Sequence, residues 1–423
     1  MNILFINLSK IFILLIPFCL VIGPAVADIV LSLSSILFVI YTIINKKYFI
    51  YNNKIFILFI IFCSYIIILS LFSINPSLSL ESSLFYFRFG IFCLFFIYII
   101  KNSPDILEFL FITLLLLFTI LFVDTIIQYT FKRNILGFPL FRGEYRVTSF
   151  FNEELKLGSF VIRFLPILIA TSYIYSLKKL NKYRDFIILF ILFLSFILIY
   201  LTGERVSLFY YLLFITLFFI FTKFELELIN KNKNKIFLLF VICVSIFIFL
   251  NENLYQRFIQ YTFFQFSQNN DFHIFSIQHE VVYITASKIF LDNPIFGVGP
   301  KIFREICSFD NYPTLTLLDK SVNGCQTHPH NTYLQLLTET GIVGFLFIFT
   351  FFCFISYKIF QHCYSVIFLK QYKYSNIYFI ILLAVFINLF PFVPNGNFFN
   401  NWLSIIYFFP ISILIWYTEE GKK

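Results

Sequence analysis

Charged residues are scarce in this chain. Asp, Glu, Lys and Arg make up 13% of the 423 residues, while 60% of the residues are hydrophobic. An ordinary globular domain carries about 25% charged residues, so a soluble protein with a polar surface is excluded. Windows of about 17 to 25 apolar residues recur along most of the chain instead. This pattern predicts an all-α polytopic membrane protein, because a helix satisfies its own backbone groups in lipid.

Metal-binding cysteine spacing is also absent from the sequence. Six of the eight cysteines lie in or beside apolar runs, where a free thiol behaves as a small hydrophobe. Cys307 and Cys325 lie together in one long polar stretch, and in an oxidising compartment they are predicted to form a disulfide, with two free thiols as the alternative. The net charge of +9 is first a topology signal in such a protein, so no nucleic-acid partner is expected.

The apolar windows predict about twelve transmembrane helices, with one large, partly helical loop between the ninth and the tenth. Helices one to nine occupy 1–250, the loop occupies 251–340, and the last three helices occupy 341–423. The predicted spans are 11–26, 28–44, 55–72, 83–100, 106–124, 157–176, 185–202, 205–222, 235–250, 341–360, 375–393 and 401–417. Ala25 to Ala27 resemble a signal-peptidase site, so the mature chain begins at Met1 or at Asp28.

The orientation of the chain follows from Lys and Arg, which collect in short cytoplasmic loops. The basic residues that fall on one side of the predicted spans are Lys46, Lys47, Lys54, Lys101, Lys178, Lys179, Lys182, Arg184, Lys223, Lys231, Lys233, Lys235, Lys358, Lys370, Lys373, Lys422 and Lys423. Both termini are therefore predicted to be cytoplasmic, in the inner membrane of a bacterium. The two longer connections, 125–156 and 251–340, are predicted to be periplasmic.

Within the large loop, the apolar periodicity predicts an amphipathic helix from about Ile277 to Leu291, with Val281, Ile284 and Ile289 on one face. Asn293 and Pro294 end it. The segment from Gly297 to Pro300 follows as a turn, and a second short helix begins between Lys301 and Ile306. The GxG of this turn is a weak phosphate motif without a preceding strand, so a structural turn is favoured over nucleotide binding.

The candidate chemistry is concentrated in the polar run that leads into the tenth predicted span. It holds His328 and His330, and Glu339 follows nine residues after His330. A neutral imidazole is well suited to take a proton from a hydroxyl group. Two alternatives remain: the histidines lie among lipid headgroups as interfacial residues, or they bind zinc, for which no third ligand at convincing spacing is present.

Several arginines lie on the predicted outer side, against the positive-inside trend. Arg205 stands at the outer end of two spans with almost no loop between them, and Arg142 and Arg146 lie together with Lys156 in the outward connection 125–156. Arg88 lies inside an apolar run, where a charge generally pairs or lines a cavity. A topology signal does not explain these positions, whereas an anionic substrate does, because guanidinium groups bind phosphate oxygens bidentately. The alternative is ion pairing with the acidic residues nearby, which are Glu144, Glu153, Glu154 and Glu204.

Five segments, in this order, resemble the O-antigen ligase family, which shares a domain with O-antigen polymerases. The matching segments are RVTSFFNEELKLGSF, LTGERVSLF, DNPIFGVGPKIF, HPHNTYLQLLTETGIVGF and PNGNFFNNW. The resemblance implies a metal-independent glycosyltransferase without cofactors, embedded among membrane lipids. Such an enzyme moves a glycan from undecaprenyl diphosphate to an acceptor sugar, which in ligases is the lipid A core.

The resemblance also implies roles for single residues. The family's loop histidine falls on His330, as the base that activates the acceptor, and its membrane-edge arginine falls on Arg205, which with Arg146 would hold the diphosphate. His279 stands where many members have an arginine, so either His279 or Arg304 takes that role or the site is built differently. Two other functions stay open: a polymerase that extends the same glycan, and a flippase in which the arginines guide the lipid diphosphate without catalysis.

Overall fold

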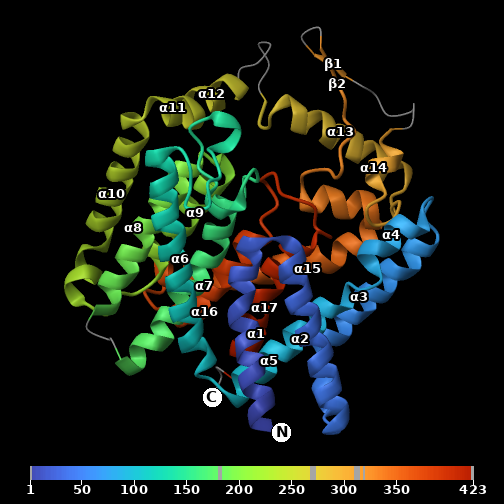
Figure 1. The fold of residues 1–423 in the computed structure, drawn as a ribbon, viewed down its shortest axis with the longest axis horizontal. Coiled ribbons are helices and arrows are strands. Elements are labelled where there is room, and N and C mark those ends of the chain that lie inside the picture. The colour runs from blue at the N-terminus through green and yellow to red at the C-terminus, as the bar shows by residue number, and fades with distance from the viewer. Residues whose placement is uncertain (1, 180–182, 267–272, 309–314, 318–319, 421–423) are drawn as a thin grey trace.

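A computed structural model describes residues 2–179, 183–266, 273–308, 315–317 and 320–420. These residues are helical apart from loops and one antiparallel hairpin, in which β1 (Leu315–Leu317) pairs with β2 (Lys320–Val322). Figure 1 shows the long helices as a bundle, with both chain termini at one end. The hairpin and four short helices gather at the other end: α11 (Glu252–Tyr255), α12 (Tyr261–Phe266), α13 (Ile277–Asp292) and α14 (Phe303–Ile306). The predicted all-α membrane class is confirmed for this part of the chain.

Ten helices in the described residues are long and apolar enough to cross a membrane. They include α4 (Pro76–Ser83) and α5 (Phe87–Asn102) taken together as one span. The other nine are α1 (Asn2–Ile22), α2 (Pro24–Ile44), α3 (Lys54–Leu71), α6 (Ile106–Phe131), α7 (Leu157–Lys179), α8 (Arg184–Thr202), α10 (Glu227–Leu250), α15 (Thr332–Phe368) and α17 (Asn401–Glu420).

The predicted count of about twelve is therefore corrected to about ten, since two predicted spans form shorter helices. These are α9 (Arg205–Phe221), with 17 residues, and α16 (Asn376–Asn388), with 13 residues. Nearly every residue of α16 after its first turn is buried, and one face of α9 is buried too. A helix that is shielded from lipid by its neighbours does not have to match the full thickness of the hydrocarbon core, which explains why length alone misjudged them.

The bundle has an inner and an outer layer. Of the hydrophobic window of α7, 89% is buried inside the protein, whereas for α10 this share is 6%. Helices α5, α7, α16 and α17 are mostly buried and form the centre. Helix α10 exposes the apolar residues of its second part, from Ile236 to Leu250. That surface is stable only in lipid.

Contacts between distant segments gather at two ends of the bundle. At the end that holds the termini, Lys101 pairs with Glu419 at 2.7 Å, and Arg184 pairs with Glu225 at 2.7 Å. The other end holds the loop unit, which comprises residues 273–308, 315–317 and 320–340. Glu305 of this unit accepts from Asn75 Nδ2 at 2.8 Å. The candidate site lies at this second end, because its histidines belong to the loop unit.

Helix α15 is broken at Gly341, which has φ 61° and ψ −172°. The break frees backbone groups, and the turn after α13 pairs with them. Val298 N donates to Thr338 O at 3.0 Å, and Gly299 N donates to Glu339 O at 2.8 Å. Ile342 N in return donates to Pro294 O at 2.9 Å. The glycine-rich turn is therefore structural, and the break falls where the tenth span was predicted to begin.

The loop unit has a small hydrophobic core of its own. Helix α13 (Ile277–Asp292) and helix α14 (Phe303–Ile306) confirm the two helices predicted there. Val281 and Ile289 are buried as expected, but Ile284 is 42% exposed, so its assignment to the buried face was wrong. Val282 and Ala286 fill that face instead. The buried face is rotated by about one residue from the predicted one, and a periodic pattern over so few residues does not define the rotation of the helix more finely.

Candidate functional site

His330 ends a polar segment that is held from several sides. Asn331 caps α15, because its Oδ1 accepts from Tyr333 N at 3.0 Å and from Leu334 N at 3.1 Å. His330 has φ 55°, a left-handed conformation that costs a side-chain-bearing residue about 1 kcal/mol. Asn395 N donates to His330 O at 2.7 Å. The loop that contains Asn395 therefore supports the strained backbone of His330.

Three histidines come together at this point. The ring centroids of His328 and His330 are 4.1 Å apart, and those of His279 and His330 are 5.5 Å apart. His279 reaches the cluster from α13, where its Nδ1 forms a 2.5 Å hydrogen bond with Ser276 Oγ. All three residues were candidates from the sequence, and the fold brings them together from two segments about fifty residues apart in the chain.

Burial keeps these imidazoles uncharged at neutral pH. It lowers the pKa of His330 below the usual value of 6.5. Burial and then the neighbouring His330 lower the pKa of His328 to about 3 and that of His279 to about 4, and the charge of Arg205 lowers the pKa of His279 further. Within the described residues, the His330 ring has no hydrogen-bond partner. A neutral ring with a free nitrogen can accept a proton from a substrate hydroxyl.

Three arginines surround the tight connection between α8 and α9. Arg146 Nε donates to Thr202 O at 3.0 Å, and Arg257 Nε donates to Gly203 O at 3.3 Å. Arg205 begins α9 and donates to Thr262 Oγ1 at 3.3 Å. Burial and the charge of Arg257 lower the pKa of Arg146, although a guanidinium stays protonated. Like charges near one another disfavour each other's charged form, and an anion bound between them would relieve that repulsion.

Two of the nearby carboxylates have other partners. Glu204 accepts from Gly158 N at 2.9 Å, from Ser159 N at 3.1 Å and from Ser207 Oγ at 2.7 Å, so it caps the first turn of α7. Glu154 pairs with Lys156. Across the described ranges, no carboxylate forms an ion pair with Arg146, Arg205 or Arg257. The charges of Glu204 and Glu144 nevertheless raise the pKa of Arg146, so its charge is partly offset within the protein. Internal neutralisation finds no such support for Arg205 or Arg257.

Two arginines are close enough to the histidines for their charges to affect them. The charge of Arg205 lowers the pKa of His279, and the charge of Arg304, which is half-buried in α14, lowers that of His328. Arg257 acts electrostatically on Arg146 and on Arg205. Arg205 acts in turn on His279, whose ring contacts that of His330. We call this row of neighbours the basic site; its members are Arg146, Arg257, Arg205, His279, His330 and His328.

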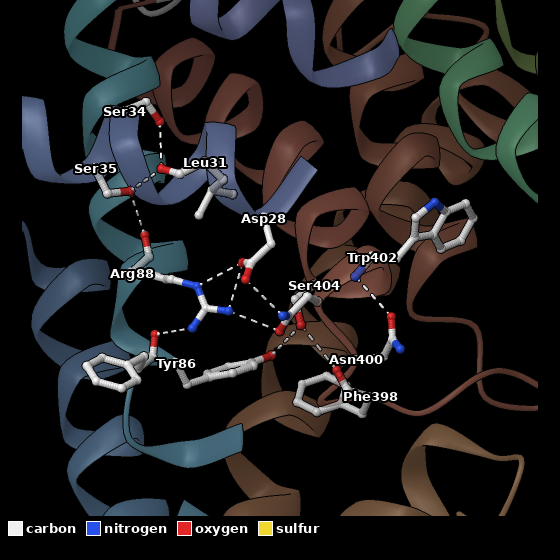
Figure 2. A network of polar contacts seen from close by, with 12 residues as sticks. Asp28, Leu31, Ser34, Ser35, Tyr86, Arg88, Phe398, Asn400, Trp402 and Ser404 are labelled. Atoms are coloured by element: carbon white, nitrogen blue, oxygen red, sulfur yellow. Dashed lines mark hydrogen bonds and ion pairs between the residues drawn. The ribbon is translucent and has the colours of Figure 1, made fainter. Parts of the chain in front are cut away.

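Other predicted residues lie apart from this row. Arg88 forms an ion pair with Asp28 at 2.8 Å and donates to Asn401 Oδ1 at 3.0 Å, in the network drawn in Figure 2. Its charge is thus neutralised between α2, α5 and α17. Arg142 is exposed and lies over the Phe141 ring. Glu339 is fully buried and accepts from Gln335 Nε2 at 2.9 Å.

A disulfide joins Cys307 to Cys325 and ties the histidine-bearing segment to α14. Next to it, Gly324 lies against α13 so closely that a Cβ atom would overlap Thr285 Oγ1. The segment before the histidines is thereby fixed at two neighbouring points. As for a metal, the structure places no three His, Cys, Asp or Glu side chains in a suitable arrangement in the ranges it describes.

Three residues of this region were missed by the sequence analysis: Arg257, Arg163 and Asn395. Arg257 lies in a π-helical turn, η5 (Gln256–Gln260), in a stretch without any motif. Arg163 lies within the apolar run of α7, and a charge inside a span was the available signal, the same one that singled out Arg88. Asn395 lies in the PNGNFFNNW segment, and its sequence context does not reveal its contact with His330.

The segment that carries most of the basic site also matches a known family. Residues 190–349 match the O-antigen ligase family. This family comprises O-antigen ligase and polymerase-type membrane enzymes, and the match confirms the resemblance over α8 to α10, the loop unit and the first turns of α15. The O-antigen ligase segment includes Arg205, Arg257, His279 and the two loop histidines. No curated protein matches the chain.

Proposed function

We propose that the protein is an O-antigen ligase-like glycosyltransferase that transfers a glycan from undecaprenyl diphosphate to an acceptor sugar, the lipid A core in the ligase reaction. The observation that carries this proposal is the basic site. It combines unpaired guanidinium groups with neutral histidines at one end of a membrane bundle. The family match supports a lipid-linked glycan as the substrate class, and the predicted topology would put the site at the periplasmic face.

In the proposed mechanism, Arg205, Arg146 and Arg257 bind the diphosphate of the donor. His330 Nδ1 or Nε2 takes the proton of the acceptor hydroxyl, whose oxygen attacks the anomeric carbon. A new C–O bond forms as the bond between that carbon and the diphosphate oxygen breaks. The electron pair leaves with the diphosphate, and the guanidinium groups stabilise its developing charge. Attack opposite the leaving group inverts the anomeric centre.

Expression in a strain that makes lipid-linked O-antigen but lacks its own ligase tests the proposal. We expect the wild-type protein to restore a ladder of glycan-bearing lipopolysaccharide, and we expect His330→Ala to reduce transfer at least about 100-fold, since a general base contributes that much. His328→Ala serves as the matched control and should retain most of the transfer. A ladder of normal intensity from folded His330→Ala would refute the assigned base.

The polymerase reaction is the second candidate, because the matched family comprises both enzyme types. The two reactions share the donor and differ in the acceptor. In the same strain, a polymerase would lengthen the glycan on undecaprenyl diphosphate without moving it to the lipid A core. The neutral imidazole next to the arginines favours either transferase over a flippase, which needs no base.

A further inference from the structure

Arg163 lies inside α7 and is buried, with 3% of its surface exposed. A charge within a membrane-spanning helix is costly and is retained where it pairs or serves a function. In the described part of the chain, no carboxylate forms an ion pair with Arg163. The charge therefore requires a different explanation from that of Arg88, which has Asp28 as its partner.

The guanidinium of Arg163 is held entirely by neutral acceptors. Nε donates to Ser159 Oγ at 3.1 Å, Nη1 to Asn388 Oδ1 at 2.7 Å, and Nη2 to Asn395 Oδ1 at 2.9 Å. Its plane also lies near the rings of Tyr210 and Tyr407, each at 5.9 Å. Contacts with three helices and one loop thus fix both its position and its orientation.

Asn395 links Arg163 to the backbone of His330 through hydrogen bonds of its side chain and its N–H. Its Oδ1 accepts from Arg163, so its Nδ2 must point to the acceptors on the other side, Thr332 Oγ1 at 3.1 Å and Tyr407 OH at 3.0 Å. Its N–H donates to His330 O at 2.7 Å, and its carbonyl lies beside His328. One residue thereby connects the buried arginine to both loop histidines.

We infer that Arg163 and Asn395 are positioning residues that hold His330 in its left-handed conformation, with the imidazole directed toward the acceptor. The role as a base rests on the proposed function, whereas the holding of His330 does not. Neither residue has to touch the substrate. Their contribution is expected in turnover and not in donor binding, because the diphosphate arginines belong to other segments.

A double-mutant cycle in the full-length protein in lipid nanodiscs tests the connection. Arg163→Gln and Asn395→Ala are each expected to lower kcat about tenfold while the KM for the donor changes less than about twofold. The double variant should be no slower than the slower single variant, because residues that act through one contact are not additive. Multiplicative losses, a loss confined to KM, or unchanged kcat would overturn the inference.

Arg163→Lys and Arg184→Lys complete the set. Lysine keeps the charge but cannot bridge Asn388 and Asn395 with one planar fork, so Arg163→Lys should recover only part of the turnover of wild type. Arg184 is equally buried but lies at the opposite end of the bundle, next to Glu225, and its lysine variant should turn over as wild type. A fully active Arg163→Lys would contradict the geometric role.

A second readout is independent of activity. Diethyl pyrocarbonate modifies neutral imidazoles, and His273, paired with Glu280 at 2.6 Å, serves as the internal reference. We expect the rate for His330 relative to His273 to rise about threefold or more in Arg163→Gln and Asn395→Ala, since local opening exposes the ring, and to stay unchanged in Arg184→Lys. Wild-type labelling in both variants would overturn the inference. If His330 is labelled faster in both variants as expected but wild type transfers no glycan, the proposed function is refuted and the positioning role of Arg163 and Asn395 stands.

Discussion

At the scale of single residues, the neutral state of the histidines is the most consequential property of the basic site. A histidine in water has a pKa of about 6.5 and is partly charged near pH 6. Here burial lowers the pKa of His330, His328 and His279. The base form of His330 is therefore present below the pH at which an exposed histidine would lose it.

This shift predicts the pH dependence of the reaction. We expect the transfer rate to stay level from pH 7.5 to about 6.5 and to fall only as the pH drops through the lowered pKa of His330. The measurement is kcat in nanodiscs between pH 5 and 8. A rate that already halves at the ordinary histidine pKa would contradict a buried base.

The same shifts predict a loss of stability in acid. The folded-state pKa values of His279 and His328, about 4 and about 3, lie below the unfolded value. Their stabilising contribution is therefore complete above about pH 6.5 and declines as the pH falls toward those folded values. Thermal unfolding of the loop unit, followed by fluorescence of an attached dye, should shift to lower temperature over this window. The shift should be smaller in His279→Gln, which removes one of the two contributions, and smaller still when His328→Gln is added.

Arg257 offers a separate prediction at the residue scale. Arg257→Gln should lower kcat/KM for the lipid-linked donor by about tenfold or more, because a hydrogen bond from a charged group to the diphosphate is lost. Arg133→Gln is the matched control, since Arg133 is exposed and its loss removes the same charge. Equal effects of both substitutions would indicate a general electrostatic effect and not a contact.

The sequence identified His330, His328, His279, Arg205 and Arg146 because each carries a local signal, either a motif or a charge on an unexpected side. Arg257 and Asn395 carry none. Their roles depend on the packing of η5 against the α8–α9 connection and of the 389–400 loop against His330, and such contacts between distant segments are not encoded in spacing. Arg88 is the opposite case: it carries a local signal but lies outside the site. Its partner Asp28 is sixty residues away in the chain, so the ion pair that neutralises it could not be recognised from the sequence.

At the scale of elements, the pairing between the glycine-rich turn and the break in α15 positions the loop unit. Gly341 has φ 61°, and a Cβ atom there would overlap the Ile295 carbonyl. Gly297 faces the same junction, with φ 69°. Each glycine is thus required both for its backbone conformation and for the close approach of the other segment.

Gly341→Ala is therefore expected to destabilise this junction by about 1–3 kcal/mol. The expected result is a lower midpoint of thermal unfolding and reduced glycan transfer. Gly137→Ala is the control, because Gly137 also has a positive φ of 86° but no atom within 4 Å of the added Cβ. If both variants unfold at the same temperature, backbone strain alone matters and the close packing does not.

At the scale of the whole molecule, the distribution of charge over the two ends predicts the orientation in the membrane. Lys288 and Lys231 are both exposed. Lys288 belongs to α13, which lies at the end of the bundle away from the chain termini, whereas Lys231 belongs to the first turns of α10 and is predicted to be cytoplasmic. In spheroplasts, a membrane-impermeant thiol reagent should modify Lys288→Cys readily and Lys231→Cys only after lysis. The reverse pattern would overturn the periplasmic assignment of the basic site.

Hydropathy predicted the helical class and the position of most spans, because the cost of exposing backbone groups to lipid is large and local. It could not separate α9 and α16 from full-length spans. The lengths of those two helices are set by burial among their neighbours, and α16 ends before Pro391 and Pro394. The extent of α15 beyond the predicted 341–360 likewise depends on its pairing with the turn after α13.

The backbone pairing at Gly341 also defines how the protein can be divided for engineering. The hydrogen bonds across the break join residues 294–299 to residues 338–343, so the two stretches form one mutually fitted set. A chimera that exchanges residues 277–343 as a single cassette keeps that set intact, together with the disulfide and the histidines. A crossover placed between Pro300 and His328 would take residues 294–299 from one protein and residues 338–343 from another, so the two stretches would not be complementary.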